Sequence, residues 1–229
     1  MDYVYICRFG DNEELRYSIR SVVKNLPNAN VWLVGGKPPW YEGNYFNVLS
    51  RGNKFDNIVK SIKTIPSIKE ISEDFVLMDD DFFVVEKMKE IPVYHGGLLS
   101  EKIKKKQAVN QKTDTYTRLL IKTLKDLRAV GIREPLNYDL HMPMTMNKTI
   151  LSDVMDKGYF PKTTYGNLAN VGGSCVTDVK VYARPNQTSY DYLTGGMPFI
   201  STIDQSFKKV YDDVLKDMFL EPSRYEAIA

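Results

Sequence analysis

The chain has 229 residues, which is enough for one large domain with a buried core. Hydrophobic residues make up 43% of it and charged residues 26%, values that exclude a disordered, collagen-like or coiled-coil protein. The formal net charge is only +2, and no apolar run approaches the roughly 18 residues that cross a bilayer. The amino terminus lacks the pattern of a signal peptide, so we expect a cytoplasmic protein with no membrane segment.

The rare residue types limit the chemistry. The two cysteines, Cys7 and Cys175, are too few for a disulfide framework or a zinc finger, which fits a reducing compartment. Because there are only two histidines, His95 and His141, any metal site must be built mainly from oxygen ligands. Oxygen ligands favour Mg²⁺ or Mn²⁺ over Zn²⁺.

The first elements in chain order form a β-α-β unit. Residues 3–7 are typical of a strand, and a helix follows that Asp11 is expected to cap, with Glu14 in the position of a capping box. Apolar residues at helical spacing continue to Leu26, and residues 31–34 form the second strand. Such a unit predicts a parallel sheet.

The middle of the chain contributes two further strands. Asp56 is the expected cap of a short helix, and residues 75–78 are a fully apolar strand of the kind found at the centre of a sheet. Strand character resumes at residues 82–85, whereas residues 86–112 are expected to be irregular.

The second half of the chain is expected to be more helical. Its predicted elements are a helix over 113–130, a loop over 137–143, a helix after Asn147, a loop-rich stretch over 161–175, strands over 179–183 and 198–200, and a helix opened by a capping box of Ser201 and Asp204. Together the elements predict a single α/β domain over residues 1–229, with a mixed, mostly parallel, Rossmann-like sheet flanked by helices.

Three consecutive carboxylates, Asp79, Asp80 and Asp81, follow the apolar strand and are the strongest chemical signal. Ligand sites in open α/β sheets lie beyond the carboxyl ends of the strands. Two carboxylates about 4 Å apart repel by roughly 1 kcal/mol in water and more inside a protein, and a divalent cation relieves that repulsion. Because side chains alternate along an extended segment, Asp79 and Asp81 share a face and are predicted to hold Mg²⁺ or Mn²⁺ together with diphosphate oxygens. The alternative is a solvated turn.

A basic segment follows this acidic centre. Residues 100–134 carry ten lysines and arginines against four acidic residues. The asymmetry suits an anionic ligand such as a nucleotide diphosphate or a nucleic acid, and solvated helix faces are the alternative. The lysines that would steer such a ligand are Lys102, Lys104, Lys105, Lys106 and Lys112.

Several stretches resemble one known family. They are residues 8–21 (RFGDNEELRYSIRS), 31–34 (VWLV), 38–40 (PPW) and 78–83 (MDDDFF), which are similar to the Stealth family of sugar-phosphate transferases. More broadly, the layout resembles a glycosyltransferase of the GT-A type with an Asp-X-Asp metal motif. The clear similarity covers about residues 3–85.

The resemblance implies a GT-A-like fold that binds a nucleotide sugar. The nucleotide-binding half would span about residues 1–85, and the acceptor-side half about residues 86–229. GT-A enzymes often use a late histidine as a third metal ligand, which assigns that role to His141 beside Asp79 and Asp81; a structural histidine is the alternative.

The nucleotide pocket would be formed by the polar residues near the end of the first strand and in the acidic triplet. These are Arg8, Asp11, Arg16 and Asp80. Arg16 and Arg20 lie one helical turn apart and would clamp a phosphate, although surface charge on an amphipathic helix explains them as well.

An inverting transferase needs a carboxylate that deprotonates the acceptor hydroxyl. Asp139 and Asp204 are the candidates, and a helix cap is the alternative role of Asp204. The predicted function is metal-dependent transfer of a sugar from a nucleotide sugar to a hydroxyl of a glycan or of a hydroxymethylated DNA base. The alternatives are transfer of a hexose 1-phosphate to a polysaccharide, and a non-catalytic module that binds a nucleotide or a metal.

Overall fold

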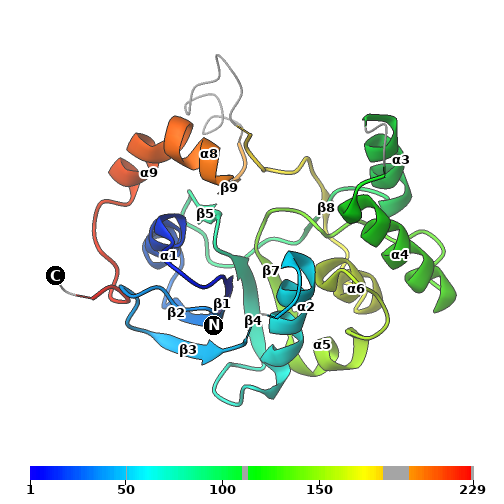
Figure 1. The fold of residues 1–229 in the computed structure, drawn as a ribbon, viewed down its shortest axis with the longest axis horizontal. Coiled ribbons are helices and arrows are strands. Elements are labelled where there is room, and N and C mark those ends of the chain that lie inside the picture. Colours follow the sequence, from blue (N-terminus) through cyan, green and yellow to red (C-terminus); the bar gives the residue numbers. More distant parts are fainter. Residues whose placement is uncertain (50, 110–112, 183–195, 228–229) are drawn as a thin grey trace.

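The computed structural model describes residues 1–49, 51–109, 113–182 and 196–227. Its centre is a five-stranded sheet in the order β3-β2-β1-β4-β7, in which only β7 runs antiparallel to its neighbour (Figure 1). The strands are β1 (Asp2–Cys7), β2 (Asn30–Gly35), β3 (Asn44–Asn47), β4 (Asp74–Asp79) and β7 (Met144–Asn147). The mixed, mostly parallel sheet predicted from the sequence is therefore confirmed.

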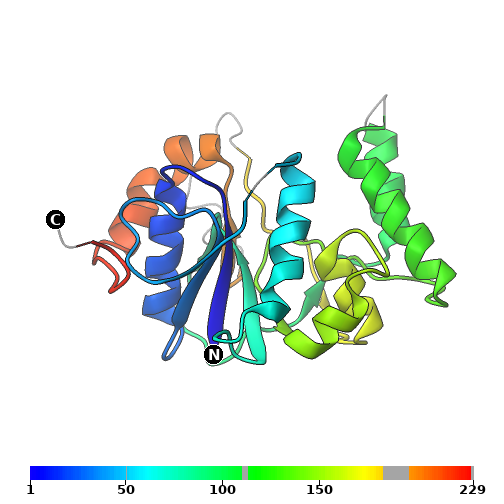
Figure 2. The same cartoon turned by 60° about the horizontal axis from the view of Figure 1, so that its bottom comes forward.

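Helices cover both faces of this sheet, with α1 and α9 on one side and α2 on the other (Figure 2). The helices are α1 (Glu13–Asn25), α2 (Lys54–Thr64), the 3-10 turn η1 (Ile65–Ser67), α3 (Leu99–Val109), α4 (Thr115–Ala129), α5 (Lys148–Val154), α6 (Pro161–Leu168), α8 (Asp204–Ser206), the π-helical turn η2 (Phe207–Tyr211) and α9 (Asp212–Met218). Two small ladders complete the described fold: β5 (Phe82–Val84) with β9 (Phe199–Ser201), and β6 (Tyr94–His95) with β8 (Ser174–Cys175).

Alternation along β1 feeds two cores. Tyr5 points to the side of α1 and packs in one cluster with Leu15 and other apolar residues of that helix. Val4 points to the opposite side, into a cluster that includes Ile62 of α2 and Leu151 of α5. Both faces of the central strand are thus buried, which explains why β1, β2 and β4 are almost continuous apolar runs.

The strand register places the acidic triplet. Ile6 of β1 lies opposite Asp79 of β4, so the two neighbouring strands end at the same level. Arg8 follows β1 directly, and the turn from Asp80 to Asp81 follows β4. The C-terminal edge of the sheet therefore gathers these residues, as the sequence predicts.

Six elements were not predicted: the two-residue strands β6 and β8, the strands β3 and β7, and the helices α3 and α6. The edge strand β3 is short and partly exposed and shows no alternating pattern. Strand β7 alternates between buried and half-buried residues, but only over four residues between a proline and a helix, which is too short a pattern to identify a strand. Helix α3 buries only Leu99 and Ile103 within a lysine-rich stretch, and α6 contains threonine, glycine and asparagine, which are weak helix formers. Tertiary burial, not local propensity, stabilises α6, since six of its residues are buried.

Three predicted helix caps are wrong by a few residues. Asn12, not Asp11, caps α1, because its side chain accepts a hydrogen bond from the Leu15 amide at 3.1 Å. Asn53, not Asp56, caps α2 in the same way. Ser201 lies in β9 and does not cap the helix that begins at Asp204; there, the Ser206 side chain accepts from the Ile203 amide.

The strand predicted over residues 179–183 is reduced to one bridge between Lys180 and Ser201. Ala183 lies outside the described residues. Within the described ranges, no helix is both long and apolar enough to cross a membrane.

Candidate active site

A cleft of about 930 Å³ opens at the C-terminal edge of the central sheet. Its floor is formed by the ends of β1 and β4, and its walls come from α2, the loop before β7, the start of α6, and the segment around α8. Among its lining residues are seven of the predicted site residues, namely Arg8, Asp79, Asp80, Asp81, Asp139, His141 and Asp204. Large pockets with convergent polar groups are the usual form of a ligand site.

Asp79 ends β4 within this cleft, and its side chain has no hydrogen-bond or ion-pair partner among the described residues. Burial raises its pKa, Lys162 and His141 lower it, and the neighbouring carboxylates of Asp81 and Asp139 raise it further. The side chain is therefore a carboxylate whose ionised form is poorly compensated by the protein alone.

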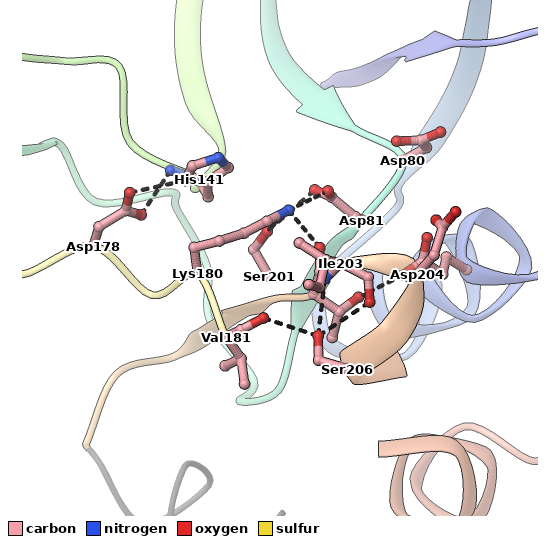
Figure 3. A network of polar contacts seen from close by, with 12 residues as sticks. Asp80, Asp81, His141, Asp178, Lys180, Val181, Ser201, Ile203, Asp204 and Ser206 are labelled. Carbon is pink, nitrogen blue, oxygen red and sulfur yellow. Dashed lines mark hydrogen bonds and ion pairs between the residues drawn. The ribbon is translucent and has the colours of Figure 1, made fainter. Parts of the chain in front are cut away.

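Asp80 turns away from Asp81, toward the start of α1 (Figure 3). It accepts a hydrogen bond from Nδ2 of Asn12 at 2.6 Å, and Nε of Arg8 lies 3.9 Å from its carboxylate. Burial and the like charges of Asp81 and Asp79 raise the pKa of Asp80 to about 6, even though Arg8 and Asn12 lower it.

The raised pKa of Asp80 predicts a pH dependence of stability. The folded protein binds this proton more tightly than the unfolded chain, whose value is near 3.8. The stabilisation that this proton gives to the folded protein is full below about pH 4 and is lost as the pH rises through 6. The loss lowers the free energy of unfolding by roughly 2–3 kcal/mol. In thermal melts without metal, the melting temperature of Asp80→Asn should rise relative to that of the wild type as the pH increases from 4 to 7. A difference in melting temperature that stays constant across that range would contradict this.

Asp81 is held by Lys180, which lies 99 positions further along the chain. Nζ of Lys180 lies 2.5 Å from Oδ2 of Asp81, and Oγ of Ser201 donates to Oδ1 at 3.1 Å (Figure 3). No cluster of three or more His, Cys, Asp or Glu side chains suited to a metal ion is present in the part of the chain that the structure describes. Asp79 and Asp81 are the candidate metal ligands, but the Asp81 carboxylate already contacts Lys180 and Ser201.

His141 is fixed by Asp178, which the sequence analysis did not single out. One Asp178 oxygen accepts from the His141 amide at 2.9 Å, and the other lies 2.8 Å from Nδ1 (Figure 3). Burial alone would raise the pKa of Asp178, but the hydrogen bonds from His141 outweigh it and lower the pKa to about 2. Because an ionised carboxylate only accepts, Nδ1 must carry the proton, which leaves Nε2 as the available ring nitrogen.

The two candidate bases differ in their surroundings. Asp139 lines the cleft, and its Oδ2 accepts a hydrogen bond of 2.5 Å from the Tyr116 hydroxyl. Asp204 begins α8 and lies 3.4 Å from Arg8; a hydrogen bond with Glu14, followed by the charge of Arg8, lowers its pKa.

Glu14 is a cleft residue, although its sequence position predicts a role in a helix cap. It is buried, it accepts a hydrogen bond from Thr202 at 2.8 Å, and burial raises its pKa. The cause of the misassignment is local: once Asn12 is the cap, Glu14 no longer occupies the capping-box position and turns into the cleft.

Asp11 and Arg16 are not among the residues that line the cleft. Asp11 accepts hydrogen bonds from the Asn12 amide and from Nε1 of Trp40, and the Arg16 guanidinium lies 4.8 Å from the centre of the Trp40 ring. Both residues lie outside the cleft lining, and their role in nucleotide binding stays a prediction.

The predicted phosphate clamp of Arg16 and Arg20 is wrong for Arg20. Its side chain is 9% exposed, and its guanidinium makes two hydrogen bonds, of 2.8 and 2.6 Å, to the Glu226 carboxylate. It also donates to the carbonyl oxygens of Phe219 and Leu220. Arg20 therefore joins α1 to the C-terminal segment and is not available for a ligand.

Comparisons with known proteins identify the fold. No protein-family model matches the sequence, and no curated protein matches it. The apo structure of the bifunctional glycosyltransferase WbbM is similar with a TM-score of 0.54 at 12% identity, over 97% of this chain and 50% of WbbM. This chain thus spans about half the length of WbbM.

Two further glycosyltransferase structures are similar at lower scores. The apo form of GlyE from Streptococcus pneumoniae TIGR4 has a TM-score of 0.42 at 11% identity, covering 96% of this chain and 60% of GlyE. Apo mouse xyloside xylosyltransferase 1 has a TM-score of 0.35 at 10% identity, covering 99% of this chain and 96% of that one. Of the three, the similarity to WbbM carries weight, and it shows a shared mixed α/β fold. The Stealth resemblance stays a prediction.

Proposed function

We propose that the chain is a metal-dependent glycosyltransferase that moves a sugar from a nucleotide-sugar donor to an acceptor hydroxyl. One observation carries this proposal: three consecutive carboxylates end β4 inside the large cleft at the C-terminal edge of the sheet. The fold shared with WbbM supports it.

The chemistry of the triplet suits Mg²⁺ or Mn²⁺. Asp79 is a poorly compensated carboxylate, and a cation would favour its ionised form. Mg²⁺ is usually held by one or two carboxylates together with substrate phosphates, so a closed set of three protein ligands is not required. We assign Asp79 and Asp81 as ligands, with Nε2 of His141 as a third. The bound ion would neutralise the charge that develops on the leaving diphosphate.

Asp139 is the better candidate for the base. Its Oδ2 is fixed by Tyr116, which leaves Oδ1 to accept the proton of the acceptor hydroxyl. Asp204 is the weaker base because its pKa is lowered, and its contact with Arg8 places it on the side assigned to the nucleotide. For Arg8, which has 56% of its side chain exposed beside Asp80, we propose contact with the phosphates of the donor.

The acceptor is proposed to be a glycan or a hydroxymethylated DNA base. Lys102, Lys104, Lys105 and Lys106 lie on α3, and Lys112 lies outside the described residues. Lys106 stacks over the ring of the cleft residue Tyr116 at 4.7 Å, which connects the basic helix with the cleft. Binding of DNA would weaken steeply with salt, whereas binding of a neutral glycan would not.

Thermal melts against UDP-, GDP-, CDP- and dTDP-sugars, each with and without Mn²⁺, test the donor proposal. A ligand that binds the native state raises the melting temperature. We expect a Mn²⁺-dependent rise for one nucleotide class, and its loss in the double variant Asp79→Ala, Asp81→Ala. A flat panel in which wild type and double variant coincide would reject the donor proposal.

Asp178 supplies a prediction of its own. Carboxylates that orient a metal-bound histidine typically change metal affinity by about 10–100-fold when they are replaced. We expect Asp178→Asn to weaken Mn²⁺ binding by about tenfold or more, because it removes the charge that holds Nδ1 of His141. Titration of Mn²⁺ by electron paramagnetic resonance measures this, and an unchanged affinity would remove His141 from the ligand set.

A further inference from the structure

Lys180 is a largely covered cation that contacts Asp81 of the acidic triplet. Its side chain is only 9% exposed, and it lines the cleft. Its three ammonium protons have three acceptors: Oδ2 of Asp81, Oγ of Ser201 at 3.2 Å, and the carbonyl oxygen of Thr202. A lysine so fully satisfied holds one position in the metal-free protein.

The contact changes what Asp81 can do. Both of its carboxylate oxygens are occupied, one by Lys180 and the other by the Ser201 hydroxyl. A divalent cation on Asp81 would lie close to the ammonium group, and like charges in a partly buried site repel by several kcal/mol. Binding of a metal ion to Asp81 would therefore weaken the contact between Asp81 and Lys180, and that contact would in turn weaken metal binding.

Lys162, a buried lysine of the same cleft, differs in this respect. Lys162 donates to the carbonyl oxygens of Leu140 and Met142, and no carboxylate contacts its ammonium group directly among the described residues. Its charge acts on Asp79 from a distance. Binding of a cation at the triplet would leave the hydrogen bonds of Lys162 intact, but not those of Lys180.

We propose that Lys180 is a built-in competitor of the divalent cation: its ammonium group neutralises Asp81 in the metal-free protein and is displaced when the metal binds. The inference rests on the metal site of the proposed function and adds the residue that sets its affinity. Displacement would also free a positive charge inside the cleft, where the anionic part of the donor is expected.

Titration of Mn²⁺ into wild type, Lys180→Met and Lys148→Met tests the proposal. Lys148 is the matched control because its side chain is also largely covered and donates to the carbonyl oxygens of Ile68 and Ile71, but does not line the cleft. By electron paramagnetic resonance, we expect Lys180→Met to bind Mn²⁺ at least about tenfold more tightly than wild type. Lys148→Met should match the wild type. Equal or weaker binding by Lys180→Met would overturn the inference.

A second measurement, the Mn²⁺-induced change in melting temperature, tests the proposal even if the substitution destabilises the fold. Lys180→Met leaves Asp81 without its cation, so the metal-free variant should melt lower and Mn²⁺ should raise its melting temperature more than that of the wild type. Lys180→Gln, which retains a donor for the Thr202 carbonyl, should behave in the same way. An Mn²⁺-induced rise no larger than that of the wild type in both variants would overturn the proposal.

The two proposals fail differently. If Asp79→Asn abolishes Mn²⁺ binding but Lys180→Met leaves it unchanged, the metal site stands and Lys180 is only a structural partner of Asp81. If no variant, including wild type, binds Mn²⁺ saturably, the metal site itself is rejected and the Lys180 inference is rejected with it.

Discussion

Asp79→Asn is expected to reduce sugar transfer by roughly 10³-fold, which is the scale of losing one main electrostatic contribution to a transition state. The substitution removes the charge but keeps the shape of the side chain. Because no described residue donates a hydrogen bond to the Asp79 side chain, and because burial disfavours its charge, the variant should melt at or above the temperature of the metal-free wild type.

The matched control is Asp74→Asn, at the opposite end of the same strand. Asp74 is exposed, and its side chain accepts one hydrogen bond from Asn147 at 2.8 Å. Turnover of this control should equal that of the wild type. If Asp79→Asn kept turnover within about tenfold of wild type, Asp79 would not be a metal ligand.

Arg20→Met should destabilise the fold by about 3–5 kcal/mol, because it removes the closest cation from a buried carboxylate. Glu226 has 5% of its side chain exposed and accepts both hydrogen bonds of the Arg20 fork. The arginine also satisfies the carbonyl oxygens of Phe219 and Leu220. Urea unfolding of wild type and variant measures the loss.

Arg16→Met is the control for this prediction, one helical turn away. Arg16 is 35% exposed and lies 3.9 Å from Glu226, so its ion pair should contribute no more than about 1 kcal/mol. A cost for Arg20→Met no greater than that for Arg16→Met would show that the buried fork does not stabilise the C-terminal segment.

The elements that the sequence predicts well are those with strong local patterns. The apolar runs of β1, β2 and β4 and the amphipathic pattern of α1 are each visible within about ten residues, and they suffice to place Asp79, Asp80 and Asp81 at the end of a buried strand. Where two cap-forming residues are adjacent, as Asp11 and Asn12 are, the pattern does not decide between them.

The partners of the site residues are what the sequence does not reveal. Asp81 meets Lys180 across 99 positions, His141 meets Asp178 across 37, and Arg20 meets Glu226 across 206. Each pair depends on how segments far apart in the sequence pack together, and no local spacing indicates it. A lone lysine or aspartate in a loop carries no signal until the fold places it beside an opposite charge.

The identity of the phosphorus-containing product tests the central claim most directly. Wild type, Asp79→Asn and Asp74→Asn would be incubated with the stabilising nucleotide sugar, Mn²⁺ and a hydroxyl acceptor, and the products followed by ³¹P nuclear magnetic resonance. We predict a nucleoside diphosphate from wild type and Asp74→Asn, dependent on Mn²⁺, and none above background from Asp79→Asn. Release of a nucleoside monophosphate would instead assign hexose 1-phosphate transfer, and no release from any variant would contradict an enzymatic role.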